Sequence, residues 1–350
     1  MKRTLMVLAL FALVAFAGDF ATGGAELTKF KGYGTFRWTM NGEEDINPAN
    51  QFSDYVWVAW LPRINDNLDF CMSAKHSQTS GFEFDAMYLN MQLTQGLSIR
   101  GGQFKLPFGY AFTRSGGSMY FADRSMITGG EFGTYGGYDI GAQATVEFAP
   151  VTVDLMLSNG TGAFANADTT CNKQFTARLA VDPTEWLTIG GSYAMVGEVD
   201  HDEVIIIGDD TTTVAVDAWS SNGMDFFAAA NYPVSPMRTL RFVGEYMIIG
   251  ARDTADDATA GNGMSVMAGY DMDIDGEVLV NVMPAVRYDA VTPVDLTGNA
   301  EDMGESRIDF CVNLGLFSNL NTLQVGMRNY GFQDDREGHT DIYANWRMNF

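Results

Sequence analysis

The sequence predicts an all-β protein: a transmembrane, antiparallel, up-and-down β-barrel of about sixteen strands, with an inward-folded third extracellular loop. Three observations predict this fold. Apolar and polar residues alternate with a period of two along most of the chain. Short and long connections alternate between the predicted strands, and the apolar face of the most regular strands carries no charged residue. The two faces of such a strand contact different environments, one apolar and one polar.

The first seventeen residues have the pattern of a targeting segment. Two basic residues precede the apolar run 5–16, which ends in small residues up to Ala17. This pattern predicts a secretory signal peptide over 1–17, because the run is too short to be a spanning helix with those flanks. Ala25 offers a later cleavage point. The mature barrel domain is expected to be 18–350, outside the cytoplasm.

Alternation of apolar and polar residues defines the strands. In residues 30–40 the even positions are apolar or glycine and the odd positions are mostly polar, and residues 138–148 show the same division, with Tyr138 among the apolar set. The second, fourth and fifth strands alternate least clearly. The full set of predicted strands is 30–40, 52–61, 68–75, 82–93, 97–104, 137–148, 151–158, 174–182, 186–194, 222–232, 239–249, 263–272, 278–289, 305–316, 321–330 and 340–350.

The connections fall into two classes. Turns of a few residues alternate with mostly longer segments, of which 105–136 is the longest and 195–221 includes a small hairpin expected over 204–216. In an even-numbered antiparallel meander, this alternation places the tight turns at one end and the long loops at the other. Bacterial outer-membrane barrels are built in this way.

The polar face of the strands is too charged for a dry core. Buried charges would need near-complete pairing against several kcal/mol of desolvation each, whereas sixteen strands enclose a lumen wide enough for water. We therefore expect a wet interior. The inward bases are Lys31, Arg37, Lys75, Arg100, Arg178, Arg241, Arg287, Arg307, Arg328 and Arg347, and the inward acids are Asp69, Asp139, Glu147, Asp154, Asp225, Glu245, Asp271, Asp289, Asp309 and Asp341.

The chain has a net charge of −23 and a pI near 4.3, and the excess of acidic residues lies mainly in the connections. Acidic runs on the predicted outer loops indicate either a solvated surface or divalent-cation bridging to anionic lipid. Such a chain lacks the clustered bases that nucleic acid requires. The loop 105–136 is a slightly basic exception: it carries Lys105, Arg114 and Arg124 against Asp123 and Glu131. In the lumen it would narrow the passage and set its field.

Catalytic and metal-binding patterns are missing from the sequence. Cys71, Cys171 and Cys311 are too few and too widely spaced for a disulfide framework or a metal site. The histidines have no partner at ligand spacing, and no Ser, His and acid group are arranged for nucleophilic catalysis. We expect no enzyme activity and no cofactor.

Several motifs resemble the phosphate-selective porin O and P family in order and spacing. They are Gly102-Gln103-Phe104-Lys105-Leu106-Pro107-Phe108-Gly109, Asp123-Arg124-Ser125, Tyr138-Asp139-Ile140-Gly141, Ser158-Asn159-Gly160-Thr161-Gly162, Val286-Arg287-Tyr288-Asp289 and the ending Ala344 to Phe350. The resemblance is specific mainly in 97–180. It implies a sixteen-stranded bacterial outer-membrane barrel, usually trimeric.

The resemblance also implies roles for residues at the C-terminus and in the loop 105–136. Phe350, with Trp346 on the same face, resembles the signal read by the barrel-assembly machinery; the alternative is an aromatic anchor at the lipid interface. Lys105 matches the Gly-Gln-Phe-Lys motif and Arg124 the Arg-Ser motif, while Arg114 has only its position in the loop.

The expected function is a porin for passive diffusion of small hydrophilic solutes, with anions such as phosphate among them. Lys105, Arg114 and Arg124 would form the constriction. The expected lumen-lining residues are Arg100, Arg178, Arg287 and Arg307, opposite Asp139, Glu147, Asp289 and Asp309. The expected partners are outer-membrane lipid, the solutes, the assembly machinery and two further copies in a homotrimer. The alternatives are a surface adhesin or structural barrel with a plugged lumen and, less favoured, an outer-membrane hydrolase.

Overall fold

The computed structural model describes most of the chain beyond the predicted signal peptide. The signal peptide, Cys171 and most of the acidic runs of the outer loops lie outside the described residues. No helix among the residues described is long and apolar enough to cross a membrane. The described ranges are 27–42, 50–78, 81–129, 135–160, 162, 173–198, 201–207, 210–216, 219–250, 261–292, 304–318, 320–332 and 337–350.

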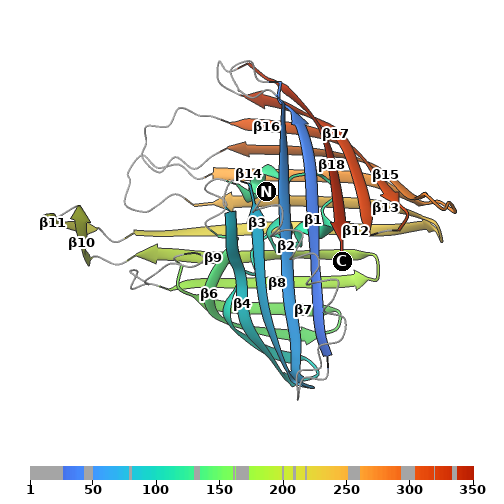
Figure 1. The fold of residues 1–350 in the computed structure, drawn as a ribbon. Helices are drawn as coiled ribbons and strands as arrows, with labels where there is room; N and C mark the ends of the chain where they lie inside the picture. The colour runs from blue at the N-terminus through green and yellow to red at the C-terminus, as the bar shows by residue number, and fades with distance from the viewer. Residues whose placement is uncertain are drawn as a thin grey trace.

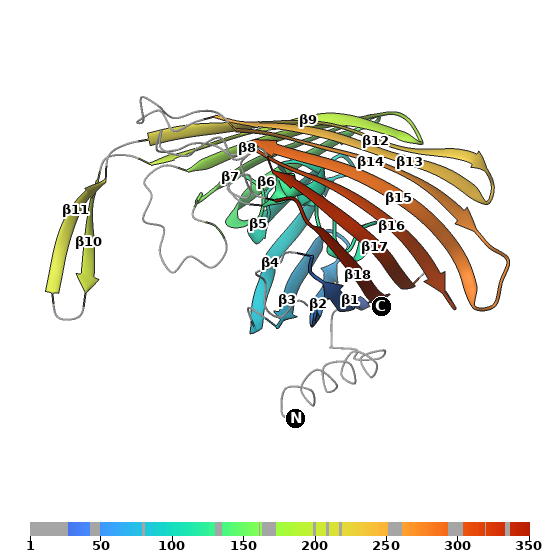
Figure 2. The ribbon, with the colours of Figure 1, turned by 90° about the horizontal axis from the view of Figure 1, so that it is seen from above.

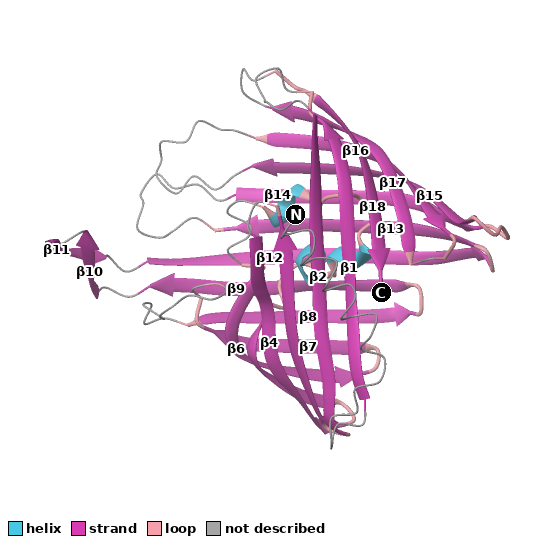
Figure 3. Cartoon of the chain, viewed as in Figure 1, coloured by secondary structure: helices cyan, strands magenta, loops and turns pink. Residues whose placement is uncertain are grey.

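Sixteen antiparallel strands close into one barrel, in which each pairs with its neighbours in chain order and the first pairs with the last (Figures 1 and 3). The predicted fold class is confirmed, and every predicted strand is present with ends shifted by a few residues. The barrel strands are β1 (Leu27–Met40), β2 (Asn50–Asn65), β3 (Leu68–Ser77), β4 (Gly81–Thr94), β5 (Leu97–Lys105), β6 (Tyr138–Phe148), β7 (Val151–Ser158), β8 (Gln174–Thr184), β9 (Leu187–Glu198), β12 (Trp219–Ser235), β13 (Arg238–Ile249), β14 (Gly261–Asp273), β15 (Leu279–Thr292), β16 (Glu305–Leu316), β17 (Asn321–Phe332) and β18 (Thr340–Asn349).

Two further strands form the predicted hairpin. β10 (His201–Ile207) pairs only with β11 (Asp210–Val216), so β9 is followed in the barrel by β12. Figure 2 shows this hairpin standing away from the barrel wall, at the end where the longer connections lie. The tight turns lie at the opposite end, as the alternation of connection lengths predicts.

The outside of the barrel is apolar, and the inside is polar. Phe226 is 57% exposed, whereas Asp225 beside it is fully buried; Phe310 is 51% exposed, whereas Asp309 is 1% exposed. Successive side chains of a strand point to opposite faces, so in each pair the phenylalanine faces outward and the aspartate faces the lumen. An exterior of this kind suits lipid, where a charge at the midplane costs about 2 to 4 kcal/mol.

The first and last strands meet in a closely packed seam. The Gly32 N–H donates to the Phe350 carbonyl (2.8 Å), and the Phe350 N–H donates to the Gly32 carbonyl (2.9 Å). A Cβ on Gly32 would lie 2.5 Å from the Trp57 carbonyl oxygen and 2.6 Å from the Phe350 ring. Trp346 lies on the outer face, 46% exposed. The role of Phe350 in assembly stays a prediction.

A β-bulge in β4 explains its irregular alternation. Ser73 of β3 pairs with Ala86, and the next residue, Ala74, pairs with Phe84, so Asp85 is the extra residue. Before the bulge the even-numbered residues of β4, such as Phe84, face outward, and after it the odd-numbered residues, such as Met87, face outward. Asp85 is therefore directed inward, 5% exposed, although the sequence analysis did not count it among the inward acids.

We expect Gly102→Ala to destabilise the barrel, because Gly102 has φ +125° and its Cβ would lie 2.3 Å from the Met87 carbonyl oxygen. Such backbone strain costs about 1 to 3 kcal/mol. Gly101→Ala is the matched control, because a Cβ there meets nothing within 4 Å. Urea unfolding in detergent, followed by tryptophan fluorescence, should show a lower midpoint for Gly102→Ala only. Equal midpoints would contradict the expectation.

Candidate functional site: the lumen and its loop

The connection between β5 and β6 enters the barrel and is bound to the opposite wall. It contains α2 (Tyr110–Thr113), η2 (Gly116–Ser118) and η3 (Met126–Thr128). Its backbone carbonyls accept hydrogen bonds from inward arginines of four strands. These contacts are Arg37 of β1 to Ala122, Arg287 of β15 to Asp123 (3.1 Å), Arg307 of β16 to Arg124 (2.7 Å) and Arg347 of β18 to Met119.

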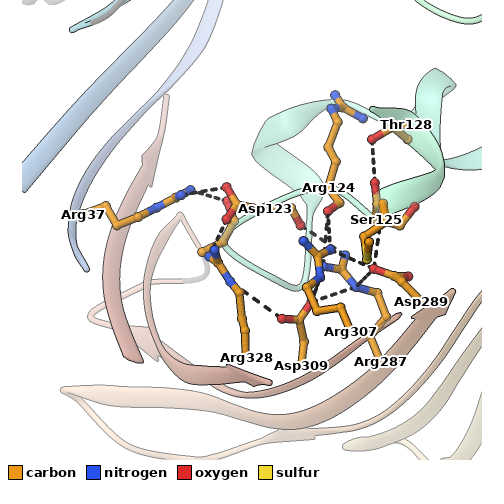
Figure 4. Close-up of polar contacts among 12 residues, drawn as sticks. Arg37, Asp123, Arg124, Ser125, Thr128, Arg287, Asp289, Arg307, Asp309 and Arg328 are labelled. Atoms are coloured by element: carbon orange, nitrogen blue, oxygen red, sulfur yellow. Dashed lines mark hydrogen bonds and ion pairs between the residues drawn. The ribbon is translucent and has the colours of Figure 1, made fainter. Parts of the chain in front are cut away.

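Asp123 is the main charged attachment of this loop. Its carboxylate lies between Arg37, at 2.6 Å, and Arg328, with which it also forms an ion pair (Figure 4). Burial raises the pKa of Asp123, but the positive charges of Arg328 and Arg37 outweigh it and hold this pKa below its usual value. The carboxylate therefore stays charged at neutral pH and links β1 to β17 through the loop.

Beneath the loop, four predicted wall residues form a buried square of alternating charge. Arg287 pairs across the sheet with Asp309, and Asp289 with Arg307. The ion pairs include Arg287 to Asp309, Arg307 to Asp289 at 2.7 Å and Arg307 to Asp309 at 3.2 Å (Figure 4). All four side chains are at most 7% exposed. They lie against the loop, and Met126 N–H donates to Asp289 (3.2 Å).

The loop is also attached on the side of β9, β12 and β13. Phe108, Phe112 and Tyr135 pack with Met247 in a buried apolar cluster. Glu245 of β13 accepts a hydrogen bond from the Ala111 N–H at 3.0 Å. Together with the charged square, these contacts occupy the side of the lumen formed by β12 to β18.

The three predicted constriction residues converge on one carbonyl oxygen. Lys105 Nζ donates to the Arg114 carbonyl at 3.1 Å, and the Arg124 guanidinium donates to the same oxygen at 2.9 Å. The Arg114 side chain lies over the Tyr120 ring, 4.7 Å from its centroid. Lys105 and Arg124 face the space left beside the loop, whereas Arg114 lines a separate, smaller cavity of about 70 Å³, which Arg124 also lines.

That space is a cavity of about 480 Å³ between the loop and the wall formed by β1 to β6. Among the described residues that line it are five bases and one acid, Asp85. Asp85 already accepts from Trp57 Nε1 (2.9 Å) and lies 3.4 Å from Lys75 Nζ. The cavity is therefore positively charged overall. Its bases are Lys31, Lys75, Arg100, Lys105 and Arg124.

A second cavity, of about 300 Å³, continues toward the tight-turn end. It shares Cys71, Tyr88 and Arg100 with the first cavity. The charged residues among the described part of its lining are Lys29, Arg63, Arg100 and Asp69. A basic wall thus extends from the loop to the end of the barrel along β1 to β5.

The other predicted lumen residues have separate environments. Arg178 pairs with Asp154 at 3.4 Å. Asp139 accepts from the Gly160 N–H at 2.6 Å. Glu147 is exposed at the end of β6, beside a tight turn. Tyr138 was placed on the lipid face by alternation, and this is wrong: it lines the cavity, with its ring 5.6 Å from Lys105 Nζ.

Sequence reasoning missed Asp85 and most of the aromatic side of the cavity, although alternation placed Tyr33 on the same face as Lys31 and Arg37. The signal for Asp85 was the change of apolar parity between Phe84 and Met87, which indicates a bulge. Tyr33, Tyr55 and Trp57 form a stack on β1 and β2, with centroid distances of 5.5 and 6.0 Å. Apolar residues that face outward alternate with these three residues. An aromatic side chain can face either lipid or the lumen, so residue type alone does not show which face it occupies.

Comparison with solved structures shows the same fold at very low sequence identity. OprB from Pseudomonas putida aligns with a TM-score of 0.69 and 10% identity over 93% of this chain and 94% of that one. An anion-selective porin from Comamonas acidovorans gives 0.63 and 12% over 93% and 99%. The trimer form of OmpT, an outer membrane protein of Vibrio cholerae, gives 0.58 and 9% over 93% and 99%.

No protein-family model matches the chain, and no curated protein matches it in sequence. The resemblance to the phosphate-selective family thus stays a prediction. The fold is that of bacterial outer-membrane β-barrels, in agreement with the predicted location. Within the described ranges, no three His, Cys, Asp or Glu side chains lie close enough to hold a metal ion.

Proposed function

We propose that this protein is an outer-membrane porin through which small hydrophilic solutes diffuse passively, with a preference for anions. The cavity beside the loop carries this proposal, because the described residues of its lining include five bases and one acid, which is already paired. Elsewhere in the described lumen, arginines such as Arg178 and Arg241 have carboxylate partners. A positive passage between low-dielectric walls concentrates anions. Phosphate is one such anion.

The proposal includes the predicted processing and assembly. Residues 1–17 would direct secretion, the barrel-assembly machinery would read Phe350 and Trp346, and three copies would associate in the membrane. The alternating charges under the loop would keep it bound at neutral pH, so that Lys105 and Arg124 stay at the narrowest part of the path. Arg114 would support them through its carbonyl oxygen.

Planar-bilayer recordings test the proposal. In a potassium chloride gradient, the reversal potential should show anion preference. Lys31→Glu should lower the anion-to-cation permeability ratio by about fivefold, the factor for ~1 kcal/mol, which is the interaction of two unit charges about 4 Å apart in water. Arg238→Glu is the matched control: it changes the net charge equally, but Arg238 is exposed at the start of β13 and lines neither cavity.

Two results would contradict the proposal. A wild-type channel that prefers cations would refute the anion preference. A purified, folded barrel that gives no regular conductance steps would instead support the alternative of an adhesin or structural barrel with a plugged lumen.

A further inference from the structure

Aromatic rings lie among the bases that line the larger cavity. Tyr33 stacks between Tyr55 and Trp57 on one side, and Lys31 Nζ lies 6.0 Å from the Trp57 centroid. All these residues line the larger cavity. A passage for small inorganic ions needs charge but gains little from apolar rings, so the aromatic lining indicates a second requirement.

Arg100 is the residue at which the charge and the rings meet. Its guanidinium carbon lies 4.7 Å from the Tyr88 centroid and 5.3 Å from the Phe104 centroid, and these two rings pack edge to face. Arg100 lines both cavities, so a solute passing along the basic wall must pass it.

Most of the inward arginines have an aspartate partner, whereas Arg100 has none among the described residues; Arg347, which has none there either, donates to the Met119 carbonyl oxygen instead. Arg37, Arg178, Arg241, Arg287, Arg307 and Arg328 each form an ion pair with an aspartate. Among the carboxylates that the structure describes, none lies within ion-pair distance of Arg100. The Arg100 guanidinium lines both cavities, so no described carboxylate competes there with that of a solute, and a guanidinium can bind a carboxylate in a bidentate manner.

We propose that the two cavities form a binding site for aromatic carboxylates, with the carboxylate on Arg100 and the ring of the solute against Tyr88 and the Tyr33–Tyr55–Trp57 stack. This inference rests on the proposed porin function and names a substrate class for it. The rings contribute through offset or edge contacts, which inorganic phosphate and acetate cannot make. Neutral sugars are disfavoured because the described carboxylates of the two cavities are already engaged, Asp85 by Trp57 and Lys75 and Asp69 by Arg63.

Block of the potassium chloride current by benzoate tests this site in single wild-type channels. Benzoate should interrupt the current in a saturable manner at a half-blocking concentration about tenfold below that of acetate, because acetate cannot make the aromatic contacts. Inorganic phosphate should also need a higher concentration than benzoate, and glucose should have no effect in the same range.

Three variants assign the effect to residues. Arg100→Gln should raise the half-blocking benzoate concentration at least about tenfold, since a charge-assisted hydrogen bond is lost. Arg178→Gln is the matched control, because Arg178 also lies over a ring, that of Phe227 at 5.1 Å, but lines neither cavity; its block should be unchanged. Tyr88→Leu should weaken block by benzoate and leave block by acetate unaffected.

The outcomes separate this inference from the proposed function. Regular conductance steps with equal block by acetate and benzoate, or with tighter block by phosphate, would overturn the aromatic carboxylate site and leave the porin intact. Absence of conductance steps would overturn the porin itself. If Arg100→Gln does not fold, the wild-type comparison of benzoate with acetate and the Tyr88→Leu variant still decide the question.

Discussion

Asp309→Asn is expected to lower the free energy of unfolding by about 3 to 5 kcal/mol, the effect of removing one partner from a buried ion pair. Asp309 is 1% exposed and lies within 3.7 Å of nitrogen atoms of Arg287, Arg307 and Arg328. Asparagine keeps the shape of the side chain but removes the negative charge, so three arginines would share fewer counter-charges. Urea unfolding of the folded barrel in detergent measures the change.

Asp69→Asn is the matched control for this loss. Asp69 also faces the lumen and pairs with an arginine, Arg63 at 3.7 Å, but both side chains are about half exposed. An exposed pair of this kind contributes about 0 to 1 kcal/mol. If the two variants unfold at the same urea concentration, burial of the charged square does not stabilise the barrel as we infer.

Asp123→Asn is expected to release the loop from the wall and to enlarge the open channel. The change removes the charge that holds Arg37 and Arg328, and each charge-assisted bond contributes about 1.5 to 3 kcal/mol. We expect a higher and noisier single-channel conductance at neutral pH. Asp275→Asn, in an exposed turn, is the control and should leave the conductance unchanged.

Acidification should reproduce this release in the wild-type channel. Because the pKa of Asp123 is lowered in the folded protein, its contribution is fully present above the ordinary carboxyl pKa near 3.9 and is lost as the pH falls through the lowered value. The conductance should therefore rise only at strongly acidic pH, and Asp123→Asn should lack this rise. A conductance that is the same in both proteins at every pH would contradict the role of Asp123.

The barrel itself was predictable because lipid and water impose opposite demands on neighbouring residues. Phe226 and Asp225 illustrate this point, since neither could change places with the other without a large desolvation cost. The prediction from alternation failed where the backbone departs from the regular two-residue period of a strand. The bulge at Asp85 adds one residue to β4, and Tyr138 begins β6 just after Gly137, whose φ is +129°.

The arrangement of the site was predictable only in part. Lys105 and Arg124 could be selected because they are bases in a long loop of an acidic chain, and the structure places both on the cavity. The loop attachment could not be derived from side-chain types, because Arg287, Arg307 and Arg347 bind backbone carbonyls. Every residue has such a carbonyl, so no sequence pattern distinguishes the ones that are used.

The seam between Gly32 and Phe350 has a consequence for how the chain reaches its final form. Pairing along this seam joins residues from opposite ends of the sequence, such as Tyr33 and Asn349, so the contact of greatest sequence separation completes the hydrogen bonding of the whole wall. A chain shortened before β18 would leave β1 and β17 with unsatisfied edges, which recruit other molecules. Insertion should accordingly behave as a slow, all-or-none event rather than strand-by-strand growth.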